Sequence, residues 1–192
     1  MYSGQLSFFE PLSSLPEGLA YRAEFVSPDE EAELLEHFRK LDFREYEFHG
    51  YLGKRRVVSF GLHYEANEGT VRSPQDIPAF LQMLRQKAAD FARLAPAELQ
   101  QALITEYTPG AGIGWHRDRP AYREVIGVSF GSPCRFRLRR KRGRSWERAS
   151  LLLEPRSIYL LRGPARSEWQ HSIPPAESLR YSVTFRSMCA GK

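Results

Sequence analysis

The chain has 192 residues, of which 42% are hydrophobic and 27% charged, a composition typical of one soluble globular domain with a sizeable core. No run of about 18 apolar residues occurs, so neither a membrane span nor a secretory signal is expected. With Cys134 and Cys189 as its two cysteines, the chain is not expected to form a disulfide framework, and a cytoplasmic location fits. The net charge of +5 favours an anionic partner such as nucleic acid.

The N-terminal segment differs in composition from the rest of the chain. Residues 1–20 are rich in Ser, Gly and Pro and are expected to form an irregular arm. Residues 21–192 are expected to form a single domain, because no linker or internal repeat divides them. No feature requires an obligate protein partner, so a monomer is expected.

Two helices are expected in the first half of the chain. In residues 25–43, Ser27 can serve as N-cap, Pro28 suits the first helical position, and Glu30 completes a capping box. Residues 77–95 carry a second one-sided apolar pattern that ends before a proline.

The second half of the chain has the character of β-structure. Turn signals rich in Gly and Pro separate six short runs of β-forming residues: 102–107, 124–130, 134–139, 150–155, 157–161 and 179–186. No helices alternate with these runs, which disfavours a parallel α/β fold. The sequence therefore predicts a mainly β protein with supporting helices, a double-stranded β-helix or jelly roll.

The stretch "GWHRD" sets His116 and Asp118 two residues apart. In an extended segment both side chains project to one face, where they can supply two metal ligands. A third ligand would come from another strand, and the other histidines are His37, His49, His63 and His171. His171 is favoured, since it lies between two late strands. A His-carboxylate-His triad suits a non-haem Fe(II) oxygenase; a zinc hydrolase is the alternative, although the chain has no HExxH or CxxC motif.

The last predicted strand, "RYSVTFR", places Arg180 and Arg186 on one face. Ser182 and Thr184 lie between them, and the aromatic and aliphatic residues face the other way. Buried arginines need partners, and a bidentate carboxylate provides one. A metal triad followed by a carboxylate clamp is the arrangement that a 2-oxoglutarate-dependent oxygenase needs.

Residues 103–187 resemble the AlkB family of Fe(II)/2-oxoglutarate-dependent dioxygenases. Three ordered motifs carry the likeness: Tyr-x-Pro-Gly before His-x-Asp, an aromatic-x-His-x-Ile segment, and Arg-x5-Arg. The resemblance implies an oxidoreductase in which His116, Asp118 and His171 bind Fe(II), with 2-oxoglutarate and O₂ as co-substrates. It makes this stretch the catalytic core, and residues 44–66 a substrate lid.

The resemblance also implies how the co-substrate is held. Tyr107 and Arg180 would bind the distal carboxylate of 2-oxoglutarate, and Arg186 would lie near its metal-chelating end. Some relatives have an Asn where this chain has Thr105, so Thr105 is a candidate contact that departs from the family pattern.

Basic and aromatic residues provide candidate substrate contacts. Residues 134–148 carry eight basic side chains against one acidic, with a turn at Gly143. Such a ribbon beside the active site would contact phosphates; the alternative is a charged edge strand that resists aggregation. Aromatic residues between 46 and 64 are candidates for stacking on an extruded base. The candidate substrate contacts are Arg55, Phe60, Tyr64, Arg139, Arg140 and Arg142.

The expected function is oxidative demethylation of N-alkylated nucleobases in DNA or RNA, as in DNA repair, with release of formaldehyde and succinate. Two alternatives remain: the same chemistry on a protein, tRNA or small molecule, and a nucleic-acid-binding module that does not catalyse. Repair members carry an acidic residue after the metal-binding Asp that faces the base. Here Arg119 and Pro120 follow, so the preferred base cannot be inferred.

Overall fold

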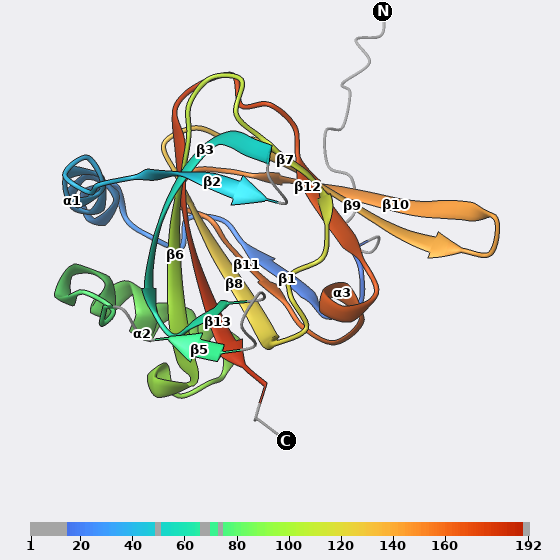
Figure 1. Cartoon of the computed structure of the whole chain (residues 1–192), viewed down its shortest axis with the longest axis horizontal. Coiled ribbons are helices and arrows are strands. Elements are labelled where there is room, and N and C mark those ends of the chain that lie inside the picture. The colour runs from blue at the N-terminus through green and yellow to red at the C-terminus, as the bar shows by residue number, and fades with distance from the viewer. Residues whose placement is uncertain (1–14, 49–50, 66–69, 73–74, 190–192) are drawn as a thin grey trace, which may run out of the picture.

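Two antiparallel β-sheets form the frame of the protein (Figure 1). The computed structural model describes residues 15–48, 51–65, 70–72 and 75–189. The predicted jelly roll is confirmed, and each of the six expected β-runs lies in a strand or overlaps one.

The larger sheet runs through the centre of the molecule. Its strands, in spatial order, are β1 (Leu19–Arg22), β11 (Ile158–Leu161), β8 (Tyr122–Phe130), β13 (Arg180–Met188), β6 (Leu99–Tyr107), β3 (Tyr51–Gly61) and β2 (Arg44–Phe48). β1 begins at Leu19, so the last residues of the segment expected to be irregular belong to the sheet. Residues 1–14 lie outside the described part.

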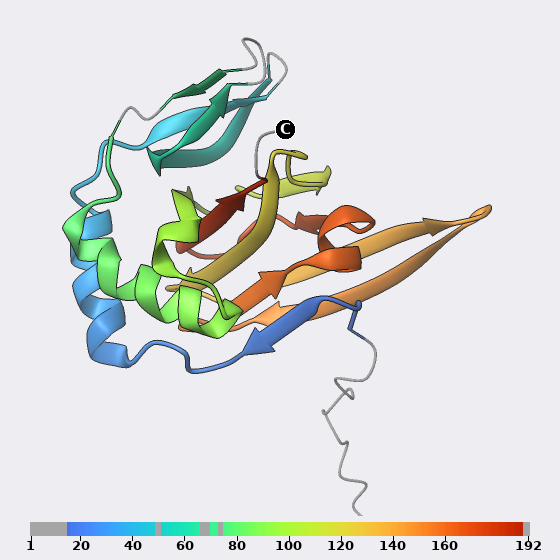
Figure 2. The ribbon, with the colours of Figure 1, turned by 90° about the horizontal axis from the view of Figure 1, so that it is seen from below.

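The smaller sheet faces the larger one and carries a long hairpin. Its strands are β10 (Ser145–Leu153), β9 (Cys134–Arg142), β12 (Gln170–Ile173) and β7 (Ile113–His116). The hairpin of β9 and β10 projects away from the body of the protein (Figures 1 and 2). The expected turn is confirmed: the strands are joined by Gly143 and Arg144, and Gly143 has a φ of 58°. A separate pair of short strands, β4 (His63–Glu65) and β5 (Thr70–Arg72), completes the β-structure.

The first helix, α1 (Pro28–Phe38), begins as the sequence predicts. The backbone N–H of Glu30 donates to Ser27 Oγ at 3.2 Å, and the N–H of Ser27 donates to Glu30 Oε2 at 2.8 Å. This capping box satisfies backbone donors that the first turn leaves unpaired.

The second helix, α2 (Gln82–Ala92), follows the 3₁₀ turn η2 (Ala79–Leu81) and packs with α1 on one face of the larger sheet (Figure 2). Phe38 anchors this core, with its ring centroid 5.4 Å from that of Phe130 and 5.7 Å from that of Tyr181. The remaining short helices are η3 (Pro96–Glu98) and α3 (Gly163–Ser167). No helix in the described ranges is both long and apolar enough to cross a bilayer.

Strand β13 separates the two cores of the protein. Tyr181, Val183 and Phe185 belong to the core beneath the helices. The alternating residues, including Arg180 and Arg186, face the space between the two sheets. The predicted two-faced strand is therefore confirmed, and one face of it is available for chemistry.

Gly127 lies at the centre of β8, opposite Tyr159 of β11. A Cβ at position 127 would lie 2.3 Å from Cε1 and Cζ of the Tyr159 ring. The phenol therefore occupies the space above a residue that must have no side chain, which explains a glycine inside a strand.

We predict that Gly127→Ala lowers the free energy of unfolding by roughly 1–3 kcal/mol through overpacking. In a Tyr159→Val background the same change should cost much less, because the clashing ring is gone. Urea denaturation of the four proteins of this double-mutant cycle measures the coupling. Equal costs in both backgrounds would contradict the packing explanation.

Candidate active site

His116 and His171 lie opposite each other on two neighbouring strands. β7 pairs with β12 so that His116 lies opposite His171, and the centroids of their rings are 4.3 Å apart. Directly opposed residues of an antiparallel pair point to the same side of the sheet. Here that side faces the larger sheet, and the structure brings the two predicted imidazoles together.

Asp118 lies two residues beyond β7, and its carboxylate completes the group. Its Oδ2 is 3.6 Å from Nε2 of His171. Its Oδ1 accepts hydrogen bonds from Nε and Nη2 of Arg186, at 3.3 and 3.2 Å. The side chain is only 7% exposed, and Oδ2 has no hydrogen-bond partner. A buried charged oxygen without a partner is costly, so Oδ2 is a ready ligand for a cation.

A backbone carbonyl fixes the orientation of His116. Nδ1 of its ring lies 2.9 Å from the carbonyl oxygen of Gly114. Because a carbonyl can only accept, Nδ1 carries the proton and donates, which leaves the lone pair of Nε2 available. Metal-binding histidines are oriented by such hydrogen bonds.

Burial and neighbouring charges set the protonation of the three side chains. Burial lowers the pKa of His171 to about 4, against an opposing effect from Asp118, and burial also lowers the pKa of His116. Burial would raise the pKa of Asp118, but Arg186 and the two histidines outweigh it and bring that pKa to about 2. At neutral pH the group therefore presents two neutral imidazoles and one carboxylate, the state in which they bind metal.

These donors fit a divalent iron. Two imidazoles and one carboxylate are the ligand set of non-haem Fe(II) oxygenases, and the orphaned Oδ2 of Asp118 lies in the group. Within the described residues, no three His, Cys, Asp or Glu side chains are already spaced to hold a metal ion, so these three side chains must draw closer together to bind one.

Arg180 is the second unusual feature of the space between the sheets. It is 1% exposed, and its Nη2 donates to Ser129 Oγ at 3.0 Å. Nε and Nη1 have no partner, and Cζ lies 4.8 Å from the ring centroid of Tyr107, the residue opposite it on β6. A buried guanidinium with two free donors fits a carboxylate ligand, as 2-oxoglutarate would supply.

The other two predicted co-substrate contacts lie on the same face. Thr105 is buried opposite Ser182, two residue pairs along the strands from Tyr107 and Arg180 and on the same face. The guanidinium of Arg186 donates to Asp118 Oδ1 and, at 3.1 Å, to Gln101 Oε1, so Arg186 lies beside the predicted metal ligands. In this structure Arg186 positions the carboxylate of the triad.

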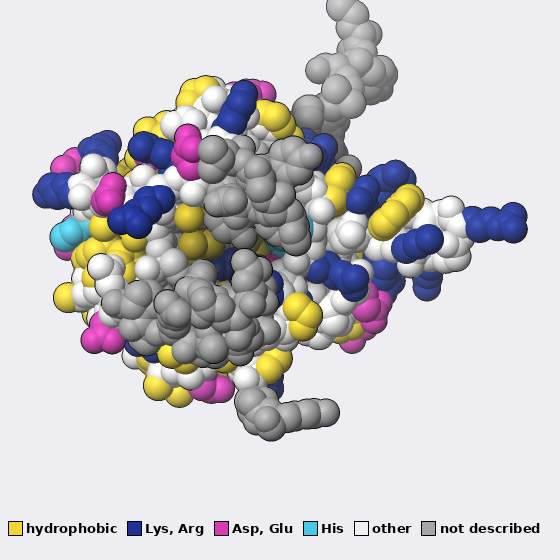
Figure 3. Space-filling view, viewed as in Figure 1, with side chains coloured by type: hydrophobic (Ala, Val, Ile, Leu, Met, Phe, Trp, Pro, Cys, Tyr) yellow, Lys and Arg dark blue, Asp and Glu magenta, His cyan; other side chains and the backbone are white. Residues whose placement is uncertain are grey.

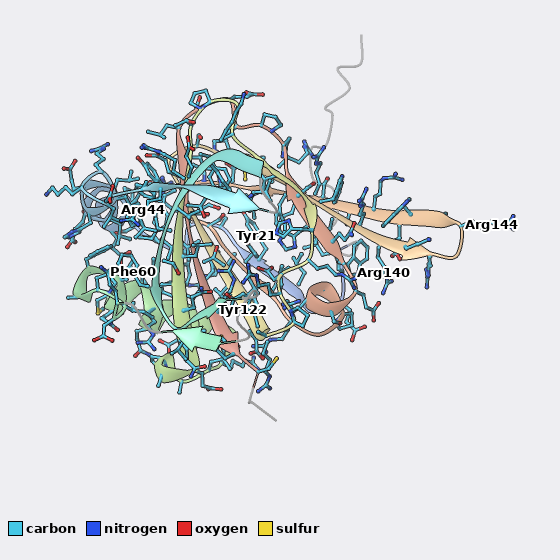
Figure 4. All side chains as sticks on the ribbon, in the orientation of Figure 1. Tyr21, Arg44, Phe60, Tyr122, Arg140 and Arg144 are labelled. Atoms are coloured by element: carbon cyan, nitrogen blue, oxygen red, sulfur yellow. The ribbon has the colours of Figure 1, made fainter. Side chains whose placement is uncertain are left out.

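Of the substrate contacts predicted in the lid, one faces the site, one lies in the core, and one is outside the described side chains. The charge of Arg55, on β3, lies close enough to lower the pKa of His116, so Arg55 faces the site. Phe60 does not: it is buried in the core beneath the helices, because residues 56, 58 and 60 of β3 point to that side (Figure 4). Tyr64, His49 and His63 lie outside the part of the chain whose side chains the structure describes.

The predicted cationic ribbon has two different faces. Arg139 points away from the site, where its guanidinium stacks on Trp115. Arg140 points the other way and pairs with Glu147 at 2.9 Å and Glu168 at 2.6 Å (Figure 4). Arg142 is exposed near the tip, 3.9 Å from Glu147. The charge of Arg140 is therefore already neutralised within the protein.

Two residues of the site have no signal in the sequence. Burial raises the pKa of the Tyr159 phenol, and the charge of Asp118 raises it further, so this O–H stays protonated beside the triad. Nη2 of Arg166, on α3, donates to the carbonyl oxygens of Arg119 and, at 2.8 Å, Tyr122. It thereby fixes the loop after Asp118. Neither residue belongs to a pattern, because their roles arise from tertiary contacts.

Comparison with known proteins identifies the superfamily of the chain. The model of the 2OG-Fe(II) oxygenase superfamily matches residues 18–186. The chain therefore belongs to that superfamily, whose members use Fe(II), 2-oxoglutarate and O₂. Within it the chain resembles proteins of the AlkB family, since ALKBH8 proteins are among its curated relatives.

Three curated relatives illustrate the likeness. The uncharacterized protein L905 of Acanthamoeba polyphaga mimivirus is 27% identical, over 91% of this chain and 87% of that protein. The alkylated DNA repair protein ALKBH8 homolog of Arabidopsis thaliana is 28% identical, over 82% of this chain and 51% of that protein. The tRNA (carboxymethyluridine(34)-5-O)-methyltransferase ALKBH8 of Mus musculus is 31% identical, over 85% of this chain and 25% of that protein. The chain thus spans about half of one ALKBH8 protein and a quarter of the other.

Two solved structures share the fold. OsALKBH1 superposes with a TM-score of 0.67 at 17% identity, over 92% of this chain and all of that chain. A prolyl-4-hydroxylase of Pseudomonas putida superposes with a TM-score of 0.62 at 15% identity, over 91% of this chain and 94% of that chain. At these identities the likeness shows the jelly roll alone.

We predict that His171→Ala abolishes 2-oxoglutarate turnover and weakens Fe(II) binding by at least about 100-fold, since even residues that only orient a ligand contribute 10- to 100-fold. His37→Ala is the matched control, because that ring lies on α1 against Phe80. Anaerobic Fe(II) titration measures the affinity, and thermal unfolding checks the fold. Retained metal binding in the His171 variant would remove it from the ligand set.

For the co-substrate, Arg180→Lys should weaken 2-oxoglutarate binding by about 10- to 100-fold, because lysine keeps the charge but lacks the planar fork. The affinity for Fe(II) alone should change less than about twofold. Arg85→Lys serves as control, since Arg85 donates to the carbonyl of Leu99 on the helix side. Calorimetric titration measures both ligands, and an unchanged 2-oxoglutarate affinity would disprove the clamp.

Proposed function

We propose that this AlkB-like oxygenase removes N-alkyl groups from nucleobases in DNA or RNA, with release of formaldehyde and succinate. The observation that carries the choice of nucleic acid is a set of basic residues beside the triad, called here the basic rim. It consists of Arg55 on β3, whose charge lowers the pKa of His116, and of Arg117 and Arg119, which flank Asp118 in the sequence. Phosphates are the natural ligands of such a rim.

The residues of the site divide the work. His116, Asp118 and His171 would hold Fe(II), which together with 2-oxoglutarate and O₂ supplies the oxidation of a C–H bond. Arg180 and Tyr107 would hold the distal carboxylate of the co-substrate.

Neighbouring residues fix the orientation and the charge of these binding groups. Arg186 keeps the Asp118 carboxylate in place and ionised. The two sheets exclude water from Arg180, which strengthens its attraction for an anion. The neutral Tyr159 phenol adds a buried hydrogen-bond donor beside the triad.

The relatives point to two nucleic-acid substrates. One carries a name for alkylated DNA repair and the other for modification of tRNA. The methyltransferase activity in the second name is not transferred, because the chain matches a quarter of that protein. Oxidation of a modified base in tRNA is the second candidate, since one relative is named for modification of tRNA. The gathered triad and the unpaired Arg180 fork argue against a module that does not catalyse.

We also propose a cytoplasmic location. Cys134 and Cys189 are both unpaired, which suits a reducing compartment.

The test is a succinate and formaldehyde assay with Fe(II) and 2-oxoglutarate, across methylated DNA, methylated RNA, tRNA and a methylated peptide. We expect formaldehyde in step with succinate for at least one methylated nucleic acid. Succinate without formaldehyde on tRNA would favour hydroxylation of a modified base. Coupled turnover on the peptide alone would overturn the proposal.

A further inference from the structure

The smaller sheet has an outer face, turned away from the triad, that no part of the proposed chemistry uses. β9 alternates, so Phe136 and Leu138 are buried toward the site, while the residues between them point outward. Residues paired with them in β10 share this direction. The outer face consists of Arg135, Arg137, Arg139, Lys141, Trp146 and Arg148, together with Trp115 of β7.

Five basic side chains on this face lack acidic partners. Arg135, Arg137 and Arg139 donate to neutral oxygens, those of Ser150, Ser172 and Gln170, at 3.3, 3.1 and 2.8 Å. Among the described residues, no carboxylate pairs with any of the five. The nearby acids, Glu147 and Glu168, instead pair with Arg140 on the opposite side of the hairpin. The positive charge of the outer face therefore has no acidic counterpart in the described residues, and Lys and Arg side chains gather over the projecting hairpin (Figure 3).

Two tryptophans are built into the same surface. Cζ of Arg139 lies 4.3 Å from the ring centroid of Trp115 and 4.4 Å from that of Trp146, so the guanidinium is held between two indoles. Arg137 lies 5.2 Å from the Trp115 ring. Trp146 remains 37% exposed. Cationic side chains interleaved with indoles are the combination by which proteins bind single strands without sequence preference.

Protection of a sheet edge does not account for this surface. Charged residues resist aggregation on edge strands, and β10 is the edge here. Four of the five basic residues lie instead on β9, and Arg137 and Arg139 are flanked on both sides, by β10 and β12. An interior strand needs no such protection, and clustered like charges destabilise the fold.

We propose that the outer face binds a single-stranded segment of nucleic acid, outside the active site. From Arg135 to Lys141 the row is about 20 Å long, at roughly 3.3 Å per residue. Phosphates bind along this row, and a base stacks on the exposed face of Trp146. Trp115 and His116 are consecutive on the edge strand β7, so the outer face and the active site meet at that edge. A strand whose modified base enters the site can continue around β7 onto the outer face.

This inference rests on the proposed function for its nucleic-acid partner, and its test is made independent of turnover. Binding of a fluorescent 20-nucleotide unmethylated single strand is followed by anisotropy at several salt concentrations, without Fe(II) or 2-oxoglutarate. For Arg135→Gln/Arg148→Gln, the salt slope should fall by about 1.4, or 0.7 per lost phosphate contact. At about 0.1 M salt that corresponds to roughly 25-fold weaker binding.

The stacking partner has a separate test. Trp146→Ala should weaken single-strand binding between about 5-fold and 100-fold, whereas Trp146→Phe should keep most of it. A duplex of the same sequence should be much less sensitive to Trp146→Ala, because its bases are already paired.

The matched control is Arg39→Gln/Lys40→Gln, which removes two exposed positive charges directly after α1, at the end of the molecule opposite the hairpin (Figure 1). It should bind like the parent protein, and thermal unfolding of all variants checks their folding. Binding unaffected by the outer-face substitutions would overturn the inference. So would a parent protein that binds anionic phosphatidylserine vesicles but no oligonucleotide. If the parent protein releases no formaldehyde from methylated nucleic acids, yet its single-strand binding depends on the outer face, the proposed function alone would be overturned.

Discussion

The buried carboxylate of Asp118 is the constraint on which the site depends. Arg186 binds one of its oxygens and leaves the other without a partner, 3.6 Å from His171. An ionised oxygen left in this state costs on the order of 1–3 kcal/mol or more. The fold tolerates that cost because the guanidinium stabilises the charge, which also keeps the pKa of Asp118 at about 2. The result is an anion prepared for a metal ion.

The two-sheet frame makes that arrangement possible. One strand, β13, delivers both arginines to the space between the sheets and sends its aromatic residues to the core beneath the helices. β7 and β12 deliver the two histidines from the facing sheet. Because the four groups come from strands paired in fixed register, their relative positions are set by backbone hydrogen bonds. Stability and chemistry thus share the same strands.

Much of this was predictable where a periodic pattern coincided with a chemical one. The alternation of "RYSVTFR" predicted the two faces that β13 shows, and the short spacing of His116 and Asp118 predicted that their side chains lie near one another. The capping box of α1 could also be predicted, because it involves residues only three positions apart. Other features depended on contacts between distant strands. Phe60 was a candidate for stacking on a base, yet it is core, because only the pairing of β3 with β6 decides which side it faces.

The cationic ribbon illustrates the same limit. The sequence indicated its charge but not that Arg140 would be neutralised by Glu168, a residue 28 positions away. Nor could it show that Trp115 and Trp146 would enclose Arg139. These contacts divide one basic stretch into a structural face and a face suited to binding.

The central claim is that three side chains form an iron site with a carboxylate clamp behind it. A crystal structure grown with Mn(II), as an inert substitute for Fe(II), and 2-oxoglutarate tests it most directly. The account predicts one metal ion bound by His116, Asp118 and His171, with Oδ2 as the Asp118 ligand and a carboxylate of 2-oxoglutarate on Arg180. A metal bound elsewhere, or a co-substrate that leaves Arg180 unpaired, would contradict it.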